Sequence, residues 1–336
     1  MFQETNIMNT NRQLLEDIIG VGSGEPISGP WRLAIYDTSH SETDSGKIFV
    51  FSEEHENDGS CPDKRHFSEL MKEILEKTSD TYILIENFIH ANDLKNPRGN
   101  PDLNKACAPV EDGILNNLRN CMDTMRLNDK YCRGSCKDRI HNIDPRADAV
   151  YVMPDGKLFE AITHYSDFQA SNGDFNEAVL TIYEALIHPL SSLFPDRKTL
   201  KGRLVGIFET LRSKMTSRQG ETFDKIWKND IIKRIVGLNS SYVNLQRKYP
   251  SSSKSLRSFT SDVEELKIMY KEFTNKLVDI FLLAHVFLIQ NIGNTDGMVI
   301  YTGSLHSLQV EKYLDQHGFK LVKKIESKGL DSCLTV

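Results

Sequence analysis

The sequence predicts an α/β protein with a mainly parallel sheet, flanked by helices and interrupted by a mostly helical insertion. Three observations predict this architecture. Short runs rich in Ile, Val, Phe and Tyr, which are typical of buried strands, stand on both sides of a long central stretch. An amphipathic segment separates two of these runs, which is the order of a βαβ unit. The central stretch has apolar residues at helical spacing.

The first α/β part covers residues 30–173. Three segments, RLAIYD, KIFVFS and TYILIENF, are short, apolar and bounded by polar residues, so they read as strands. Between the last two, KRHFSELMKEILEK at 64–77 has the apolar spacing of an amphipathic helix. A strand, a helix and a strand in this order predict two parallel strands with a right-handed crossover.

Residues 174–292 form the predicted helical insertion, and residues 293–336 return to α/β. The insertion contains four stretches with helical periodicity, at 174–194, 203–215, 221–238 and 261–292. The final part is predicted as strand GMVIYTG, helix SLQVEKYLDQHG and strand FKLVKKI. We expect this last part to complete the same sheet as residues 30–173, which makes the chain a single composite domain.

Composition excludes several classes of protein. The 336 residues carry a formal net charge of −6, which argues against a general nucleic-acid binder. The N-terminal residues lack the basic start and apolar core of a signal peptide. The longest apolar run, FLLAHVFLIQ at 281–290, is too short for a membrane span. We therefore expect a soluble intracellular protein with no nucleic-acid partner and no membrane span.

The six cysteines do not form the pattern of a disulfide scaffold in a chain of this length. Cys132 and Cys136 are close enough to share a zinc ion, and Cys107 and Cys121 lie just upstream. The spacing fits no common zinc-finger pattern. Free thiols are favoured over structural zinc or a disulfide.

Ionisable side chains follow the ends of several predicted strands. Glu53 and His55 come directly after IFVFS, and Glu86 follows TYILI. His306 lies three residues after the Gly that ends MVIYTG. Ligands bind beyond the carboxyl ends of the strands in open parallel sheets. Imidazole and carboxylate groups together either ligate a divalent metal or run acid/base chemistry without one.

A fourth segment, RIHNIDPRAD at 139–148, carries Asp144 and Arg146 after a short apolar stretch. If its strand neighbours the others, these two side chains reach the same edge of the sheet. Each candidate also has a structural interpretation. A Glu at a strand end is usually solvated, His306 is placed to cap a helix, and Arg146 is placed to pair with Asp144.

These motifs resemble those of the erythromycin esterase, ChaN-like and TraB/Tiki group. The opening motif of that group is a strand, Gly-Glu-x-His or a close variant, a helix, and a strand ending in Glu. Here the matching residues are Glu53, His55 and Glu86, and the usual Gly is Ser52. The late motif, a strand with Gly-x-x-His and a helix, is similar to YTGSLH with His306.

The segment HNIDPR also resembles an internal Asp-x-Arg element of some members, which here is Asp144 and Arg146. The combination of motifs is similar to uncharacterised proteins of large double-stranded DNA viruses. The resemblance covers roughly residues 45–90, 138–150 and 297–323. The group includes metal-dependent peptidases, esterases that need no metal, and ligand-binding proteins, so membership alone does not choose a reaction.

The leading hypothesis is a hydrolase-like site that cleaves an ester or amide bond of a small-molecule or peptide substrate. Its catalytic residues are Glu53, His55, Glu86 and His306, and Asp144 and Arg146 bind the substrate. In one version a divalent metal ion is held by His55, Glu86 and His306, and its bound water is the nucleophile. In the other version a histidine activates the water directly.

The alternative is a catalytically inactive family member that works as a binding protein or a virion-associated structural protein. Ser52 and the large helical insertion favour this alternative. The insertion offers a surface for another protein, because FLLAHVFLIQNI is apolar nearly all round and has to be buried. A viral protein of this kind is expected in the host cytoplasm or in the virion.

Overall fold

The chain divides into two compact units. One, here called the α/β unit, comprises residues 1–87, 93–144 and 281–336, and the other, the helical unit, comprises 88–92 and 145–280. The computed structural model describes residues 13–38, 46–53, 64–86, 102–108, 114–126, 129–144, 209–248, 256–293, 295–327 and 333–336.

The main sheet of the α/β unit has six strands in the order β6-β5-β7-β3-β2-β8. The strands β6, β5, β7 and β3 are parallel to one another, and β2 and β8 add antiparallel pairings at one side. The α/β class and the mainly parallel sheet are therefore confirmed. The strands are β2 (Arg32–Asp37), β3 (Lys47–Glu53), β5 (Thr81–Ile85), β6 (Ile140–Asn142), β7 (Gly297–Gly303) and β8 (Lys320–Glu326).

The strand that follows the insertion lies at the centre of the sheet. β7 pairs in parallel with β3 on one side and with β5 on the other. All seven of its residues are buried, as expected for a strand covered on both faces. The expected pair β3 and β5 is parallel, but the two strands are not adjacent because β7 separates them.

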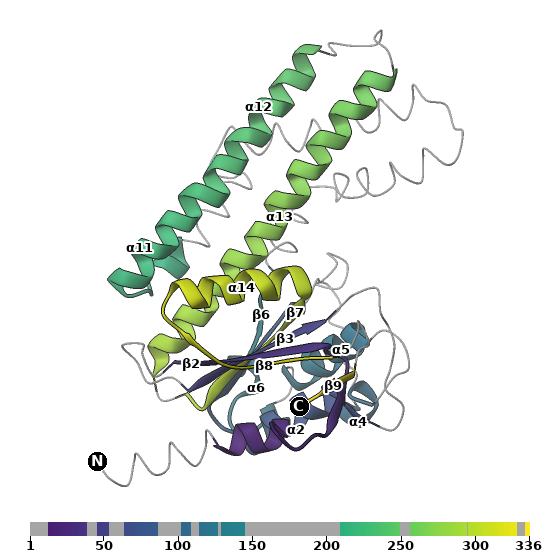
Figure 1. Ribbon diagram of the computed structural model, residues 1–336, viewed down its shortest axis with the longest axis vertical. Helices are drawn as coiled ribbons and strands as arrows, with labels where there is room; N and C mark the ends of the chain where they lie inside the picture. Colours follow the sequence, from purple (N-terminus) through teal and green to yellow (C-terminus); the bar gives the residue numbers. More distant parts are fainter. Residues whose placement is uncertain are drawn as a thin grey trace. The chain divides into compact units, whose positions relative to one another are not determined.

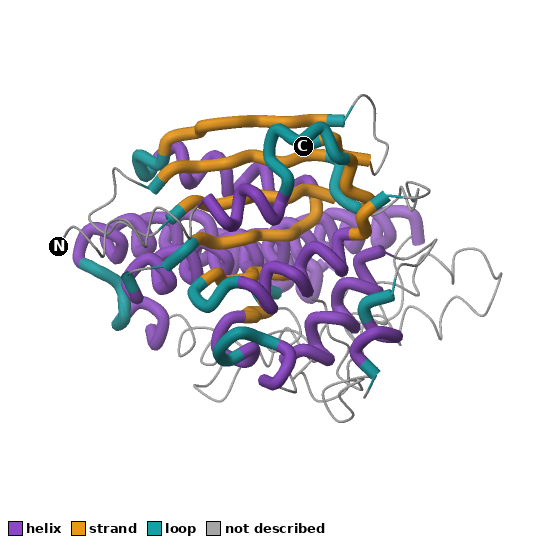
Figure 2. The backbone as a smooth tube through the Cα atoms, turned by 90° about the horizontal axis from the view of Figure 1, so that it is seen from below, coloured by secondary structure: helices purple, strands orange, loops and turns teal. Residues whose placement is uncertain are grey.

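Helices cover both faces of this sheet (Figure 1). Phe49 and Phe51 belong to the core shared with α2 (Phe67–Lys77) and α5 (Ile114–Arg126). Ile48 and Val50 face the other core, which holds α14 (Ser304–Gln316) and the last turns of α13 (Leu256–Ile292). The alternation follows from the two-residue period of a strand. Figure 2 shows the strands side by side.

A second, small sheet was not expected from the sequence. It consists of β1 (Pro26–Ser28), β4 (Arg65–His66) and the C-terminal β9 (Cys333–Thr335), in the order β4-β1-β9. Residues 13–19, which precede it, are helical and contribute Leu15 and Ile19 to the core. Strands of two or three residues carry too little pattern to be recognised in a sequence.

Short helical turns complete the described part of the α/β unit. They are α4 (Leu103–Ala106), η1 (Asp129–Tyr131) and α6 (Cys136–Arg139).

The described residues of the helical unit are mostly helical. The predicted helix at 174–194, and residues 203–208 of the next predicted helix, lie outside the described residues. The described elements are α11 (Ser217–Ile226), the π-helical turn η2 (Trp227–Ile232), α12 (Lys233–Lys248) and residues 256–280 of α13. Two ion pairs join α12 and α13: Arg234 with Glu272 at 2.5 Å and Lys248 with Asp262 at 2.6 Å. Their order along the two helices shows an antiparallel hairpin (Figure 1). No helix in the described ranges is long and apolar enough to cross a membrane.

The prediction of free thiols is wrong for the described cysteines. Cys107 and Cys121 form a disulfide with their Cα atoms 4.6 Å apart, and Cys132 and Cys136 form another at 5.4 Å. Cys333 is disulfide-bonded as well. Cys107 follows α4 and Cys121 lies within α5, and only the packing of these helices brings the two residues together. Disulfides form and persist mainly in oxidising surroundings.

Candidate functional site

The carboxyl edge of the main sheet collects the ends of three neighbouring strands. β3 ends at Glu53, which is level with Gly303 at the end of β7. Glu86 follows β5, and its backbone N–H donates to the carbonyl of Tyr301 at 3.1 Å. Because these strands are parallel, their last residues meet at one edge. Glu53, Glu86 and the first turn of α14 are therefore neighbours.

Glu86 and His306 face each other at this edge. One carboxylate oxygen of Glu86, Oε2, accepts a hydrogen bond from the backbone N–H of Gly303 at 3.1 Å. The other, Oε1, lies 3.7 Å from Nε2 of His306. The exposed fractions of the two side chains are 4% and 8%. An acid and a base that are nearly removed from water interact more strongly than the same groups on the surface.

Glu53 is paired with a tyrosine that the sequence analysis did not single out. The hydroxyl of Tyr301 donates to Oε2 of Glu53 at 2.7 Å. Burial raises the pKa of Tyr301 well above its usual value, and the charge of Glu53 raises it further. Tyr301 therefore keeps its proton and acts as a hydrogen-bond donor. In the sequence, the one sign of this role was the position of Tyr301 near the end of its strand, two residues before Gly303.

Hydroxyl groups hold α14 against the strand ends. Ser304 Oγ donates to the carbonyl of Glu53 at 2.7 Å and accepts from the indole N–H of Trp31 at 3.1 Å. Ser52 Oγ bonds to Ser307 Oγ at 2.6 Å. Ser52 is fully buried, so the residue that replaces the usual Gly has a specific contact with the helix that carries His306.

A cation approaches the same edge from α5. Arg119 donates from Nε and Nη2 to the backbone carbonyl of Glu86, at 3.2 and 3.0 Å. Its charge also acts on Tyr301. ILNNLRNCMDTMR was not predicted as a helix, although its buried residues Leu118, Cys121, Met122 and Met125 have helical spacing, and Arg119 was therefore not among the predicted site residues.

The remaining predicted site residues divide into two groups. Asp144 follows β6, is 2% exposed, and its N–H donates to the side-chain oxygen of Asn142 at 2.9 Å. The N–H of Ile143 donates to Ile85 O at 3.0 Å, so Asp144 is at the same edge, one strand further along. His55 and Arg146 lie outside the described residues.

The described residues do not contain a complete metal site. No cluster of three or more His, Cys, Asp and Glu side chains among them has a geometry that holds a metal ion. Glu86 and His306 supply two donors, whereas catalytic zinc takes three protein ligands and a water. His55 is the third ligand that the family resemblance implies.

Comparisons of the chain with protein-family models, with curated proteins and with solved structures found no match.

Proposed function

We propose that the protein is a hydrolase that cleaves an ester or amide bond of a small molecule or peptide, with Glu86 and His306 as its acid/base pair. The observation that carries this proposal is the approach of the Glu86 carboxylate to His306 Nε2, 3.7 Å apart and nearly buried. The pair stands where parallel α/β sheets bind their ligands. Catalytic contacts are often long without substrate and tighten when it binds.

The roles follow from which nitrogen faces the carboxylate. Glu86 faces Nε2 of His306, and in this proposal the contact shortens to a hydrogen bond when substrate binds. Glu86 then stabilises the imidazolium and the tautomer with the proton on Nε2. The proposal assigns the proton transfer to Nδ1, which takes a proton from the attacking water and returns it to the leaving group. The N–H of Gly303 holds the Glu86 carboxylate in place during both steps.

Glu53 has a supporting role in this proposal. Its hydrogen bond from Tyr301 fixes the carboxylate beside the reacting pair. Asp144 and Arg146 are the proposed substrate-binding residues, with Arg146 suited to an anionic group. We also propose membership of the erythromycin esterase, ChaN-like and TraB/Tiki group, whose motifs assign roles to Glu53, His55, Glu86 and His306.

The metal-dependent version needs His55 in addition to Glu86 and His306. A divalent ion held there would supply a Lewis acid and a bound hydroxide. Of these three ligands, Glu86 and His306 are among the described residues, and the proton transfers proposed for His306 need no metal.

A second candidate function is a protein-binding or virion-associated structural role. Val236 on α12 and Ile268 on α13 favour it, because these large apolar side chains of the helical hairpin are 59% and 58% exposed. Single exposed apolar residues are common, but two of this size on one hairpin suit a partner surface.

The test is a screen of ester and peptide substrates with matched variants. His306→Gln and Glu86→Gln should each lower kcat/KM by about 100-fold or more, the usual contribution of a positioned acid or base. Lys312→Gln changes an exposed residue on the same helix and should leave the rate unchanged. Metal content of the purified protein, measured before and after His306→Gln, separates the two versions. An inactive wild type that forms a stable complex with another protein supports the second function instead.

A further inference from the structure

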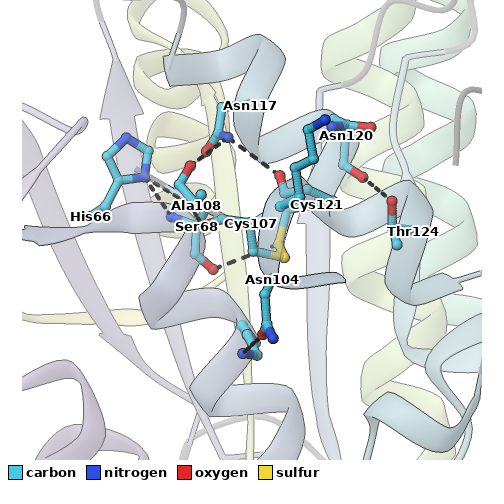
Figure 3. The surroundings of a disulfide bond; sticks show 12 residues. His66, Ser68, Asn104, Cys107, Ala108, Asn117, Asn120, Cys121 and Thr124 are labelled. Atoms are coloured by element: carbon cyan, nitrogen blue, oxygen red, sulfur yellow. Dashed lines mark hydrogen bonds between the residues drawn. A yellow bond between two sulfur atoms is a disulfide. The ribbon is translucent and has the colours of Figure 1, made fainter. Parts of the chain in front are cut away.

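A disulfide and three hydrogen bonds fasten one small helix pair in the α/β unit (Figure 3). The sulfur atoms of Cys107 and Cys121 join the end of α4 to the middle of α5, and both residues are buried. Asn117 Nδ2 donates to the carbonyls of Ala106 and Ala108, at 3.3 and 2.9 Å. Ser68 Oγ, in the first turn of α2, donates to the carbonyl of Cys107 at 3.1 Å.

The same α5 helix reaches the carboxyl edge of the sheet through Arg119. Residues two positions apart on a helix point in nearly opposite directions. Asn117 and Cys121 therefore hold α5 on one side while Arg119 extends from the other side to the carbonyl of Glu86. The anchored side of the helix decides where the guanidinium lies.

Glu86 in turn contacts α14. Arg119 donates to the backbone carbonyl of Glu86. The carboxylate of Glu86 accepts from the N–H of Gly303 and faces His306. Fixing the backbone of a residue fixes the origin of its side chain. A continuous set of contacts therefore leads from the disulfide, through α5 and Arg119, to the proposed acid/base pair.

We propose that Arg119 is a positioning residue for Glu86, and that the Cys107–Cys121 disulfide makes this positioning depend on the redox state of the protein. The expected effect on catalysis rests on the proposed function, whereas the structural link from the disulfide to Glu86 is independent of it. α4 has four residues, too few to be stable as an isolated helix. Without the covalent bond, the segment is retained by the hydrogen bonds from Asn117 and Ser68 and by the packing of Leu103 in the core, which are all weaker than a covalent link.

The redox step is an ordinary thiol–disulfide exchange with a dithiol such as dithiothreitol. The dithiol gives two electrons and two protons, the S–S bond breaks, and Cys107 and Cys121 become thiols. The dithiol becomes a cyclic disulfide. Because both sulfurs are buried, the reaction in the folded protein requires local opening, and it is slower than at an exposed disulfide.

The structural test measures amide hydrogen exchange at Gly303, whose N–H donates to the Glu86 carboxylate. The Cys107→Ser/Cys121→Ser double variant should exchange there about tenfold faster than the wild type, since a local opening becomes more frequent. Arg119→Gln, with the disulfide intact, should give a similar increase. Arg119→Lys should restore part of the protection, because an ammonium group still donates to the carbonyl.

The matched control is the Cys132→Ser/Cys136→Ser double variant. This disulfide joins residues separated by 4 in sequence and precedes β6, whose start is at the opposite edge of the sheet. It should leave Gly303 exchange within about twofold of the wild type. Equal acceleration by both double variants would show general loosening and overturn the proposal. Unchanged exchange in Arg119→Gln overturns the positioning role, and unchanged exchange in the Cys107→Ser/Cys121→Ser variant overturns the redox dependence.

Kinetics then separate this inference from the proposed function. Arg119→Gln should lower kcat with little change in KM, and should change the pH profile of kcat, which a purely structural role would not do. A wild type without hydrolase activity, together with the expected exchange pattern, refutes the function and leaves the redox-dependent positioning standing. If the cysteine variant does not fold, reduction of the wild type followed at Gly303 decides the redox claim, with unchanged exchange after complete reduction counting against it.

Discussion

The two ends of β5 are held by the same kind of contact, with different consequences. At its start, Arg139 donates from Nε to the carbonyl of Thr81 at 2.8 Å. Just after its end, Arg119 donates to the carbonyl of Glu86. Each arginine is on a helix that carries a disulfide cysteine: Arg139 is three residues after Cys136 in α6, and Arg119 is two residues before Cys121 in α5.

The difference lies in what surrounds each guanidinium. Arg139 is 3% exposed and also donates to the carbonyls of Leu75 and Arg133 and to Thr78 Oγ1. Burial lowers its pKa to about 10, while the charges of Asp80 and Asp296 raise it. These direct acceptors are all neutral, so this arginine ties backbone segments together. Arg119 instead holds a residue whose carboxylate faces a histidine. The same device stabilises the fold at one end of β5 and orients reactive groups at the other.

The largest effect that tests this comparison is expected from Arg139→Met. The substitution removes the guanidinium donor from the carbonyls of Thr81, Leu75 and Arg133, of which the Leu75 carbonyl still accepts from the N–H of Arg133. Each buried group that is left unsatisfied costs about 1–3 kcal/mol. We expect a total loss of roughly 3–5 kcal/mol in the free energy of unfolding, since relaxation and water offset part of the cost. Urea denaturation under oxidising conditions measures it.

Arg119→Gln is the matched change at the other end of β5. It should cost about 1 kcal/mol, because the hydrogen bonds from Arg119 to the carbonyl of Glu86 are only partly buried. Equal losses for the two variants would show that Arg119 stabilises the fold as much as Arg139 does, which contradicts the difference between the two ends of β5.

A second effect concerns His285 and the neighbouring His141. His285 donates from Nδ1 to the carbonyl of Phe281 at 2.8 Å and lies beside His141, with ring centroids 5.6 Å apart. Burial lowers the pKa of His285 to about 4, and the neighbouring His141 lowers it further, whereas the hydrogen bond raises it.

The pKa of His141 is also lowered, by burial first and by Arg126, while Asp138 opposes the shift. The ring of Tyr82 is stacked with that of His141, with their centroids 6.0 Å apart.

The sign of the pH effect follows from these shifts. Both histidines have a lower pKa in the folded state than in the unfolded chain, so the fold favours their neutral forms. Their contribution to stability is complete above about pH 6.5 and is lost as pH falls toward about 4, by up to about 1.4 kcal/mol per pH unit for each proton taken up. His285→Gln should flatten the dependence of the unfolding free energy on pH in this window. An unchanged slope in His285→Gln contradicts the assignment.

The sequence predicted the sheet better than it predicted the site. KIFVFS, TYILI and GMVIYTG are buried apolar strands whose composition identifies them locally, and their parallel order brought Glu53, Glu86 and His306 to one edge. The contact of Tyr301 with Glu53 could not be predicted, because a tyrosine in an apolar strand has the pattern of an ordinary core residue. Arg119 and the Cys107–Cys121 pair depend on how α5 packs, which local pattern does not encode. The roles of His55 and Arg146 remain predictions, since both lie outside the described residues.

The smallest expected effect on activity concerns Ser52, where the motif that the sequence resembles has Gly. Its hydroxyl bonds to Ser307 in α14 at 2.6 Å, and Ser307 donates to the carbonyl of Ser304 at 3.0 Å. Ser52→Gly removes this bond and places a flexible residue in a central strand, which together should cost about 1–2 kcal/mol of stability. The Glu86 and His306 side chains do not contact Ser52 in any described interaction, so kcat/KM should stay within about twofold of the wild type. Ser52→Ala separates the two contributions, because it removes the hydroxyl and keeps the strand stiff. A large gain of activity in Ser52→Gly would show instead that the hydroxyl holds α14 in an inactive position. Ser52 would then have a role in the site and not only in the stability of the fold.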